Sequence, residues 1–215
     1  MHVFKIKLKL IIKMHFNNIL KNEKIDNKDY TDKILTFSYL LNMKFVKCNF
    51  EKIHLRESSF DKCTFEDCKI KSTNFEASRF KDTKFINSNL SYADFRGCAF
   101  DSVDLISNYA NYSKFRNSYF KNGNLSQNQF NYVDFNKVVY ENIKLEENSM
   151  QNCKMFMSFF AECNINKVIF DNSNLLLSKF INNDISQTSM KDIKDVCILF
   201  KNNKGQYLDN WENYA

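Results

Sequence analysis

Large apolar residues recur at every fifth position of this chain from Leu40 to Met190, and the register never slips. Only Ala110 fails to supply a bulky side chain. A period of five fits neither an α-helix, with about 3.6 residues per turn, nor a β-strand, whose side chains alternate. The chain must therefore turn a corner every five residues.

A second period, of twenty residues, appears when these apolar centres are sorted by their spacing. One set is almost entirely aromatic and includes Phe60, Phe80, Phe100, Phe120, Phe160 and Phe180. Four sides of five residues would close a square coil of twenty, with coils stacked at the spacing of β-strands, about 4.8 Å. The pattern from residue 36 to residue 190 predicts an all-β solenoid of about seven to eight coils with a core of stacked phenylalanine rings.

The position two residues before each centre is mostly occupied by small residues. Six of the seven cysteines fall in this slot: Cys48, Cys63, Cys68, Cys98, Cys153 and Cys163. A buried thiol packs like a small apolar group, whereas structural zinc sites use closely paired cysteines with further Cys or His ligands. We therefore expect the cysteines to be packing residues, and we predict no metal site and no cofactor.

Asn108, Asn128 and Asn148 occupy the small slot at intervals of twenty, and Asn108 precedes the exceptional centre Ala110. Buried amides need hydrogen-bond partners, and amides stacked from coil to coil can supply them. The spacing predicts an internal asparagine ladder. A pocket or bulge at Ala110 is the alternative interpretation.

The register breaks after Met190, because Asp195 would be the next centre. Met190, Ile193, Cys197 and Phe200 recur at helix-like intervals, which predicts a short helix over residues 189–201 that caps the solenoid.

An aromatic tail follows this predicted helix and contains Tyr207 and Trp211. With Ile193 and Phe200 these residues form either an end cap or a dimer contact, because aromatic side chains are favoured at interfaces. The chain is thus divided into an N-terminal cap or extension (1–35), the repeat array (36–190), and a C-terminal helix with its tail (191–215).

The N-terminal segment is rich in lysine and alternates partly like a strand between Val3 and Met14, although Phe4, Leu8, Ile11 and Ile12 also suit a helix. Its lysines are interleaved with apolar residues rather than clustered, so an end cap is favoured over a basic helix on a membrane surface. Its apolar runs are too short for a signal peptide or a membrane span. We expect a cytoplasmic protein, with delivery into a host cell as the alternative.

No constellation of residues predicts catalysis or nucleic-acid binding. His54 lies beside a centre at an outward position and has no suitably spaced Ser, Cys or Asp partner. The chain has too few glycines for a phosphate-binding loop. Charges of both signs are interspersed along the array, which is typical of a solvated surface rather than a nucleic-acid groove. We expect a protein that is not an enzyme.

The repeats resemble those of the pentapeptide-repeat proteins, whose pattern is approximately A(D/N)LXX. The stretches NLSYA-DFRGC, NFEAS-RF and SNLLLSKF carry this pattern, often with Phe in place of the central Leu. The resemblance implies a right-handed quadrilateral β-helix, in agreement with the period of twenty.

The best-understood members of that family resemble DNA in shape and charge, bind type II topoisomerases, and protect DNA gyrase from quinolones or peptide toxins, usually as dimers joined through their C-termini. The resemblance therefore implies a non-catalytic partner of DNA gyrase or topoisomerase IV that gives drug or toxin tolerance, with a homodimer contact at the C-terminus. Those members are typically acidic, whereas this chain has a net charge of +6 and no non-repeat insertion in its array. A protein-binding scaffold or bacterial effector is the alternative.

Overall fold

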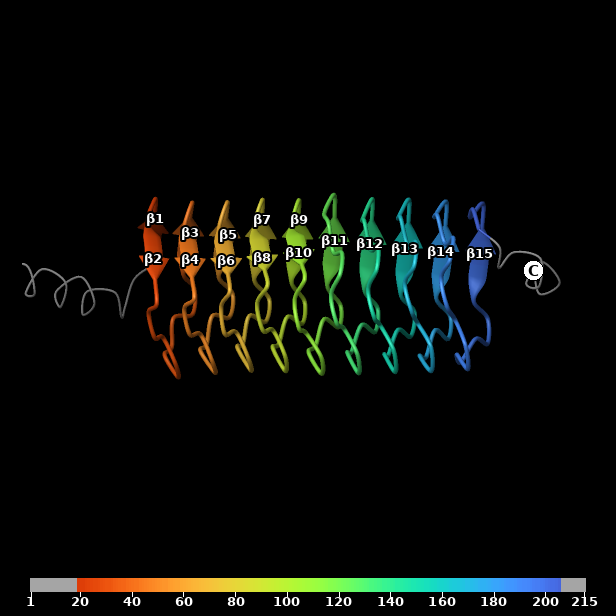
Figure 1. The fold of residues 1–215 in the computed structure, drawn as a ribbon, viewed down its shortest axis with the longest axis horizontal. Coiled ribbons are helices and arrows are strands. Elements are labelled where there is room, and N and C mark those ends of the chain that lie inside the picture. The colour runs from red at the N-terminus through yellow and green to blue at the C-terminus, as the bar shows by residue number, and fades with distance from the viewer. Residues whose placement is uncertain (1–18, 206–215) are drawn as a thin grey trace, which may run out of the picture.

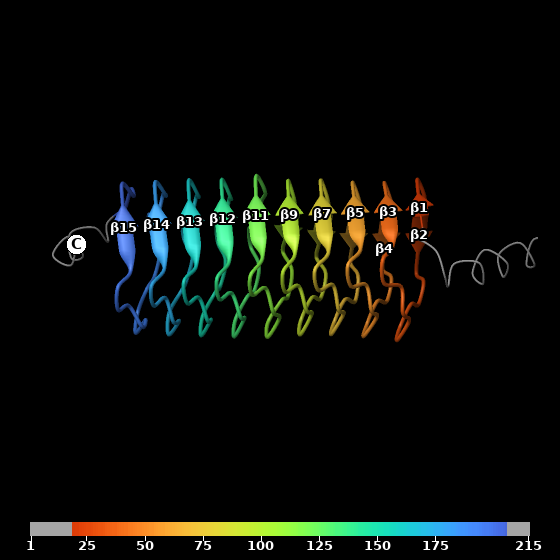
Figure 2. The ribbon, with the colours of Figure 1, turned by 180° about the vertical axis from the view of Figure 1, so that it is seen from behind.

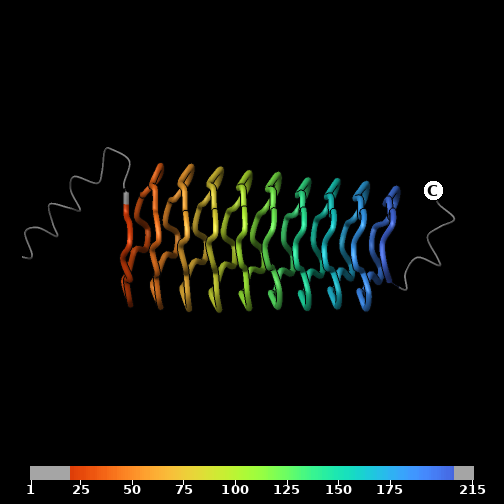
Figure 3. Tube along the Cα trace, turned by 90° about the horizontal axis from the view of Figure 1, so that it is seen from above, coloured from red at the N-terminus to blue at the C-terminus, as the bar shows by residue number. Residues whose placement is uncertain are grey.

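Each five-residue repeat forms one side of a four-sided coil in the computed structural model, which describes residues 19–205. Residues twenty apart pair in parallel, as Phe60 does with Phe80. The coils stack into a rod of about nine turns, with the first strand and the last at opposite ends (Figure 1). The view from behind shows the same single file of coils (Figure 2), and the tube seen from above shows their even spacing (Figure 3).

The corner of every side is a turn that contains a residue with positive φ. This residue lies two positions after each centre, from Asn22 to Asn202, and its φ lies between 48° and 62° wherever it is not glycine. Positive φ is unfavourable for most residues and worst for β-branched ones. Asn and Asp are frequent at these corners, and Val, Ile and Thr are absent from them. The period of five in the sequence is therefore the period of these turns.

Two sides of the coil form parallel sheets of short strands. Face 1 carries ten strands: β1 (Ile19–Lys21), β3 (Tyr39–Leu41), β5 (Ser59–Asp61), β7 (Arg79–Lys81), β9 (Ala99–Asp101), β11 (Tyr119–Lys121), β12 (Val139–Glu141), β13 (Phe159–Ala161), β14 (Lys179–Ile181) and β15 (Leu199–Lys201). Face 2 comes next along each coil and carries five: β2 (Lys24–Asp26), β4 (Lys44–Val46), β6 (Thr64–Glu66), β8 (Lys84–Ile86) and β10 (Asp104–Ile106).

Face 3 and face 4 complete the coil and are held by isolated β-bridges. Asn49 pairs with Lys69 on face 3, and Asn74 pairs with Asp94 on face 4. The backbone hydrogen bonds of these faces run between coils as they do in the sheets, for example from Asn74 N to the Ile53 carbonyl at 2.9 Å. All four sides are therefore held from coil to coil.

Stacked aromatic rings fill the interior behind face 1. Successive ring centroids from Phe60 to Phe200 lie 4.3–5.3 Å apart, close to the strand spacing of about 4.8 Å. Phe65 and Phe75, behind faces 2 and 4, meet the Phe60 ring edge-on. Complete burial of each ring stabilises the fold by roughly 1.5–3 kcal/mol. The stacked phenylalanine core predicted from the period of twenty is confirmed.

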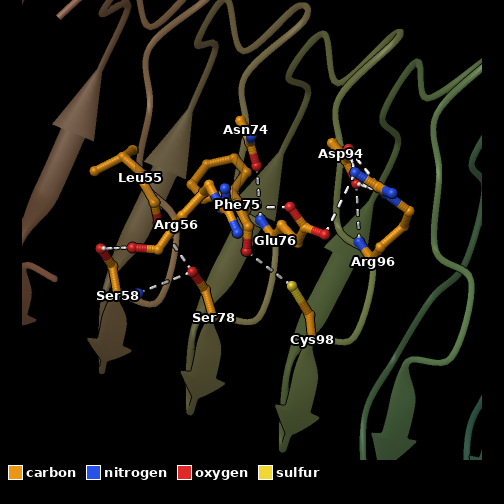
Figure 4. Close-up of polar contacts among 10 residues, drawn as sticks. All are labelled: Leu55, Arg56, Ser58, Asn74, Phe75, Glu76, Ser78, Asp94, Arg96 and Cys98. Carbon is orange, nitrogen blue, oxygen red and sulfur yellow. Dashed lines mark hydrogen bonds and ion pairs between the residues drawn. The ribbon is translucent and has the colours of Figure 1, made fainter. Parts of the chain in front are cut away.

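The small residue two positions before each centre links neighbouring coils. Ser78 Oγ donates to the Leu55 carbonyl at 2.9 Å and accepts from Ser58 N at 3.0 Å (Figure 4). Cys98 Sγ donates in the same way to the Phe75 carbonyl at 3.1 Å. Hydroxyl and thiol groups are interchangeable here because both are small and both can reach the carbonyl of the coil before.

The amides of Asn108, Asn128 and Asn148 form a ladder in this slot. Asn108 Nδ2 donates to Asn128 Oδ1 at 3.1 Å, and Asn128 Nδ2 donates to Asn148 Oδ1 at 3.2 Å. The same oxygens accept the backbone N–H groups of Asn108 and Asn128 at 2.9 and 2.7 Å. A second, shorter ladder joins Asn183 to Asn203 at 3.0 Å. Ala110 is fully buried.

The helix predicted over residues 189–201 is wrong, because the chain completes another coil there. Lys194 N donates to the Ser173 carbonyl and Leu199 N to the Ser178 carbonyl, at 2.9 and 3.0 Å. Asp195 occupies a centre position at the end of the rod, where it is only half-buried. An isolated helix of this length is marginally stable, whereas the coil before offers preformed hydrogen-bond partners along its whole edge.

The solenoid also begins earlier than predicted. Residues 19–35 were expected to be part of a cap, but Leu20, Ile25, Tyr30 and Leu35 are half-buried centres packed against the core. The small slots of this first coil hold Glu23, Lys28 and Lys33, all exposed. The rod therefore has about nine turns instead of seven to eight. The segment between Val3 and Met14, expected to form part of an N-terminal cap, lies outside the described residues.

The buried hydroxyl of Tyr140 yields a stability prediction. Its ring stacks between Phe120 and Phe160, and its Oη has no hydrogen-bond partner. A buried polar group without a partner costs about 1–3 kcal/mol, so we expect Tyr140→Phe to raise the free energy of unfolding by about 1 kcal/mol in urea titrations. Tyr119→Phe is the control, because the Tyr119 hydroxyl donates to Glu141. A destabilised Tyr140→Phe protein would contradict the prediction.

The asparagine ladder yields a second prediction. Asn128→Ala leaves the N–H and the amide of Asn108 without their shared acceptor, Asn128 Oδ1, and should lower the free energy of unfolding by about 2–4 kcal/mol. Asn128→Ser is the matched control, because serine bridges the coils from this slot elsewhere, as at Ser78. Serine should recover part of the loss, and equal stabilities for the two variants would argue against the ladder.

The buried thiols yield a third prediction. Burial raises the pKa of Cys63 to about 11 and that of Cys68, Cys153 and Cys163 to about 12. Unfolded chains release thiol protons near pH 8.5, so above that pH the folded state binds more protons and stability should fall as the pH rises. The urea midpoint at pH 10 should be lower than at pH 8.

Serine substitutions test the source of that pH dependence. A variant with serine at Cys63, Cys68, Cys153 and Cys163 should show a smaller decrease between the two pH values than the wild type. Among the described cysteines, only the exposed Cys197 should react with a thiol reagent in the folded protein. An unchanged pH dependence in the serine variant would assign the effect to other groups.

Candidate functional site

The residues singled out from the sequence build the core. Six phenylalanines fill the column behind face 1 and are at most 1% exposed: Phe60, Phe80, Phe100, Phe120, Phe160 and Phe180. The ladder residues Asn108, Asn128 and Asn148 are equally buried. Ile193 and Phe200 lie half-buried on the last coil, where the Phe200 ring stacks on Phe180 at 5.1 Å. Tyr207 and Trp211 lie outside the described residues.

Side chains that could take part in catalysis or metal binding are scattered over the rod. The exposed His54 pairs through its backbone with Ile34 and Asn74 on face 4. No cluster of three or more His, Cys, Asp or Glu side chains within residues 19–205 could hold a metal ion. The same residues include no helix with the length and hydrophobicity of a membrane span.

A shallow hollow lies at the C-terminal end of the rod. It is lined by Ser186, Gln187, Lys204 and Gly205, where the described chain ends. No hydrogen bond or ion pair groups these residues around a common point. The outer faces therefore offer the candidate surfaces for binding.

The outward row next to each centre of face 1 alternates in charge. Asp61, Lys81, Asp101, Lys121 and Glu141 stand on successive coils, paired through their backbones. Lys121 Nζ lies 3.0 Å from a Glu141 oxygen. A duplex presents an uninterrupted row of negative charges, and this row is interrupted at every second coil.

Exposed ion pairs neutralise much of face 2. Lys44 contacts Glu66 at 2.7 Å, and Lys84 contacts Asp104 at 3.0 Å, each across neighbouring coils. Exposed pairs contribute little to stability because water screens them. Their main effect is to leave this face with little net field.

Face 4 carries a connected set of ion pairs around Glu76 (Figure 4). Glu76 lies 3.3 Å from Arg56 Nε on one side and 3.4 Å from Arg96 Nη2 on the other. Arg96 also donates from Nε and Nη2 to the Asp94 carboxylate, with the shorter contact at 2.7 Å. These hydrogen bonds to Asp94 raise the pKa of Arg96. The set fixes long side chains in a row along the rod.

The corner between faces 3 and 4 carries three exposed tyrosines on successive coils. Tyr92, Tyr112 and Tyr132 are 51%, 47% and 53% exposed, and all three have the left-handed corner conformation. Their rings stack nearly parallel at 5.1 and 5.0 Å. A fourth exposed tyrosine, Tyr109, lies on the flat part of face 3.

Amide side chains order the surface beside these tyrosines. Asn111 Oδ1 accepts from Asn131 N at 2.9 Å, and Asn131 Oδ1 accepts from Gln151 N at 3.0 Å. Ser149 Oγ also donates to Asn131 Oδ1 at 2.7 Å. We name the outward residues of 89–92, 109–112, 129–132 and 149–152 the tyrosine face. All of them are Tyr, Asn, Gln or Ser.

Exposed apolar side chains gather at the corner between faces 4 and 1, toward the C-terminal end. Met157, Leu177 and Val196 are all exposed, and Val196 reaches 64%. Leu199 on β15 lies beside the same corner and is also exposed. This apolar edge is a second candidate surface for contact with another molecule.

Neither surface was predicted from the sequence, because the period of five constrains the inward positions and leaves the outward positions free. The signal for the tyrosine face is the recurrence of tyrosine at 92, 112 and 132, one coil apart. The ion pairs of face 4 have a similar signal in Arg56, Glu76 and Arg96.

Comparison with known proteins agrees with this architecture. A profile of the pentapeptide repeat region matches residues 33–115 and 58–135. No curated protein sequence matches the chain.

Two solved structures share the fold over most of the chain. One trypsin-treated variant of QnrB1, described as a plasmid-mediated fluoroquinolone resistance protein, is 18% identical with a TM-score of 0.60. Another is 20% identical with a TM-score of 0.61. Each alignment covers 91% of this chain and 94% of the other. From its repeats, its coil and the matching profile, the chain belongs to the pentapeptide-repeat family.

Proposed function

We propose that this protein is a non-catalytic binding protein that recognises another protein through the outer faces of its rod. The observation that carries the proposal is the ordered outer surface. Ion pairs on face 4 and amides on face 3 are held in rows by contacts between coils. Side chains fixed in this way lose little conformational entropy when a partner binds.

A type II topoisomerase, DNA gyrase or topoisomerase IV, is the first partner that we propose. Support comes from the likeness of fold to QnrB1, described as a fluoroquinolone resistance protein, and from the functions of pentapeptide-repeat proteins. Binding of this kind would give tolerance to a drug or toxin and would place the protein in the bacterial cytoplasm. A C-terminal contact between two copies, implied by the same family, would involve the apolar edge near Val196.

A scaffold or effector that binds a different protein is the second candidate. The alternating charges of face 1 favour it, because Lys81 and Lys121 interrupt the acidic row formed by Asp61, Asp101 and Glu141. A surface of alternating sign suits a protein partner with its own mixed charges better than a cleft built for DNA.

The topoisomerase proposal is tested by gyrase supercoiling with a fluoroquinolone. Addition of the full chain should raise the drug concentration needed for half inhibition, or should inhibit supercoiling directly. If neither effect is seen over a wide concentration range, with gyrase or with topoisomerase IV, this partner is rejected and the scaffold or effector function remains.

Charge variants locate the contact. Lys81→Glu with Lys121→Glu makes the face 1 row uniformly acidic, and should strengthen binding to a DNA-binding enzyme if this face is used. Lys114→Glu with Lys154→Glu is the matched control, since it makes the same charge change on face 4. Equal effects of the two pairs on gyrase affinity would show a response to net charge alone and exclude face 1 as the specific contact.

A further inference from the structure

The tyrosine face is distinguished by the absence of charge. The outward positions of face 3 from Ser72 to Ile169 hold no Asp, Glu, Lys or Arg. Elsewhere in residues 19–205, no face lacks a charged residue over two successive coils. Cores of protein interfaces are depleted in charge and enriched in tyrosine, and Tyr, Ser and Asn dominate antibody paratopes. The composition therefore favours a protein partner.

The stacking of the rings disfavours a nucleic acid as the partner of this face. Tyr92, Tyr112 and Tyr132 stack on one another, and Lys71 Nζ lies 5.7 Å from the Tyr92 centroid on the side of the preceding coil. The ring faces between these three residues are therefore occupied, whereas nucleic-acid bases bind by stacking on free ring faces. About half of each tyrosine side chain is exposed, so these residues can meet the amides and hydroxyls of another protein.

In two of the three outward columns of face 3, the charges that border the tyrosine face reverse from one end to the other, whereas the third column has Lys69 at one end and the uncharged Ile169 at the other. One outward column reads Glu51, Lys71, four uncharged residues, Asp171 and Lys191. When the column is read from its other end, every charged position carries the opposite sign. The corner column beside it has Lys52 at one end and Asp192 at the other, also of opposite sign.

We propose that the tyrosine face binds a second copy of this chain, with the two rods antiparallel and the twofold axis between the coils of Asn111 and Asn131. In this arrangement a residue of one outward column faces the same column of the partner, read in the opposite direction. Lys71 faces Asp171 of the partner subunit, and Glu51 faces Lys191 of the partner subunit. Lys52 faces Asp192 of the partner subunit.

The uncharged middle of the face is complementary to itself in the same register. Tyr112 faces Tyr132 of the partner subunit, and Tyr92 faces Asn152 of the partner subunit. Phenol hydroxyls and amides can each donate and accept. Because no charge is buried in the middle, the contact carries no large desolvation penalty.

The bordering charges also select this register over its neighbours. A slide of the rods by one coil in one direction brings Glu51 opposite Asp171 of the partner subunit. A slide by one coil in the other direction brings Lys71 opposite Lys191 of the partner subunit. Like charges in contact disfavour both alternatives, so specificity arises from repulsion as well as attraction.

Complementary charge variants test the proposal. Variant A carries Lys52→Asp and Lys71→Asp, and variant B carries Asp171→Lys and Asp192→Lys. Each variant alone brings like charges together at both ends of the interface, so its dimer should dissociate about tenfold or more readily than the wild type in analytical ultracentrifugation. An equal mixture of A and B should restore dimers, because every altered pair is again of opposite sign.

Circular dichroism melting checks that both variants are folded. This matters for variant B, because Asp171 Oδ1 accepts from Ser189 Oγ and Lys191 N in the wild type. A dimer whose affinity is unchanged in A and in B would overturn the proposal.

Crosslinking tests the orientation independently of affinity. Ser72 and Asn172 are exposed corner residues outside the tyrosine ladder, and Ser72 faces Asn172 of the partner subunit in the proposed dimer. In a Cys197→Ser background, Ser72→Cys and Asn172→Cys chains should be joined by a short bis-maleimide only when mixed. Two copies of residue 72 would lie about five coils apart, roughly 24 Å. Crosslinking of Ser72→Cys with itself would overturn the antiparallel arrangement.

A tail variant separates this contact from the C-terminal one. Tyr207→Ser with Trp211→Ser in the full chain should leave the dimer intact. Loss of the dimer in this variant, with no effect of variants A and B, would assign the contact to the C-terminus. A wild type that is monomeric at all concentrations would refute the proposal. The gyrase assay decides the proposed function separately, since it does not require this contact.

Discussion

The turn with positive φ, repeated every five residues, is the constraint on which the rest of this structure depends. It fixes which residues point inward, because the centre and the residue two positions before it face the core while the others face solvent. It also sets the coil at twenty residues, so that each side chain lies above its equivalent in the coil before. Stacked rings, bridging hydroxyls and the asparagine ladder all follow from that one alignment. The positive φ explains why these corners contain no β-branched residue, although such residues are common in strands.

The interior was predictable from the sequence because an inward position has few physical solutions. A centre must be large and apolar. A residue in the small slot must either be apolar or donate a hydrogen bond to the carbonyl within its reach. The environments of Phe60 and Asn128 could therefore be predicted from their residue types and positions. The ends were not predictable in this way. Glu23, Lys28, Lys33 and Asp195 break the rule for inward positions, and the break at Asp195 led to the wrong prediction of a helix. Within residues 19–205, an inward side chain of the first or last coil has a neighbouring coil on one side only, so these charged side chains are exposed or only half-buried.

The outer surface was less predictable, because an outward position accepts nearly any residue. Period alone does not say whether Arg56, Glu76 and Arg96 contact one another, since that depends on the rotamers of long side chains. The sequence does contain identical residues at the spacing of one coil, as in Tyr92, Tyr112 and Tyr132. In a solenoid, identical residues one coil apart are neighbours in space. Rows of identical residues at outward positions are therefore as informative as rows at inward positions.

A rod with repeated faces has a general difficulty in recognition, because every coil resembles the next and many registers are nearly equivalent. Uncharged rows such as the tyrosine face make the difficulty worse, since tyrosine and amide contacts tolerate a slide of one coil. Charges that change sign along the rod remove the degeneracy, because only one alignment satisfies all of them. Charges in inward slots act similarly at the ends, where Asp195 and Lys28 oppose the stacking of one rod on another as an added coil. Specificity in this chain therefore resides where the repeat is broken, whereas stability resides where it is kept.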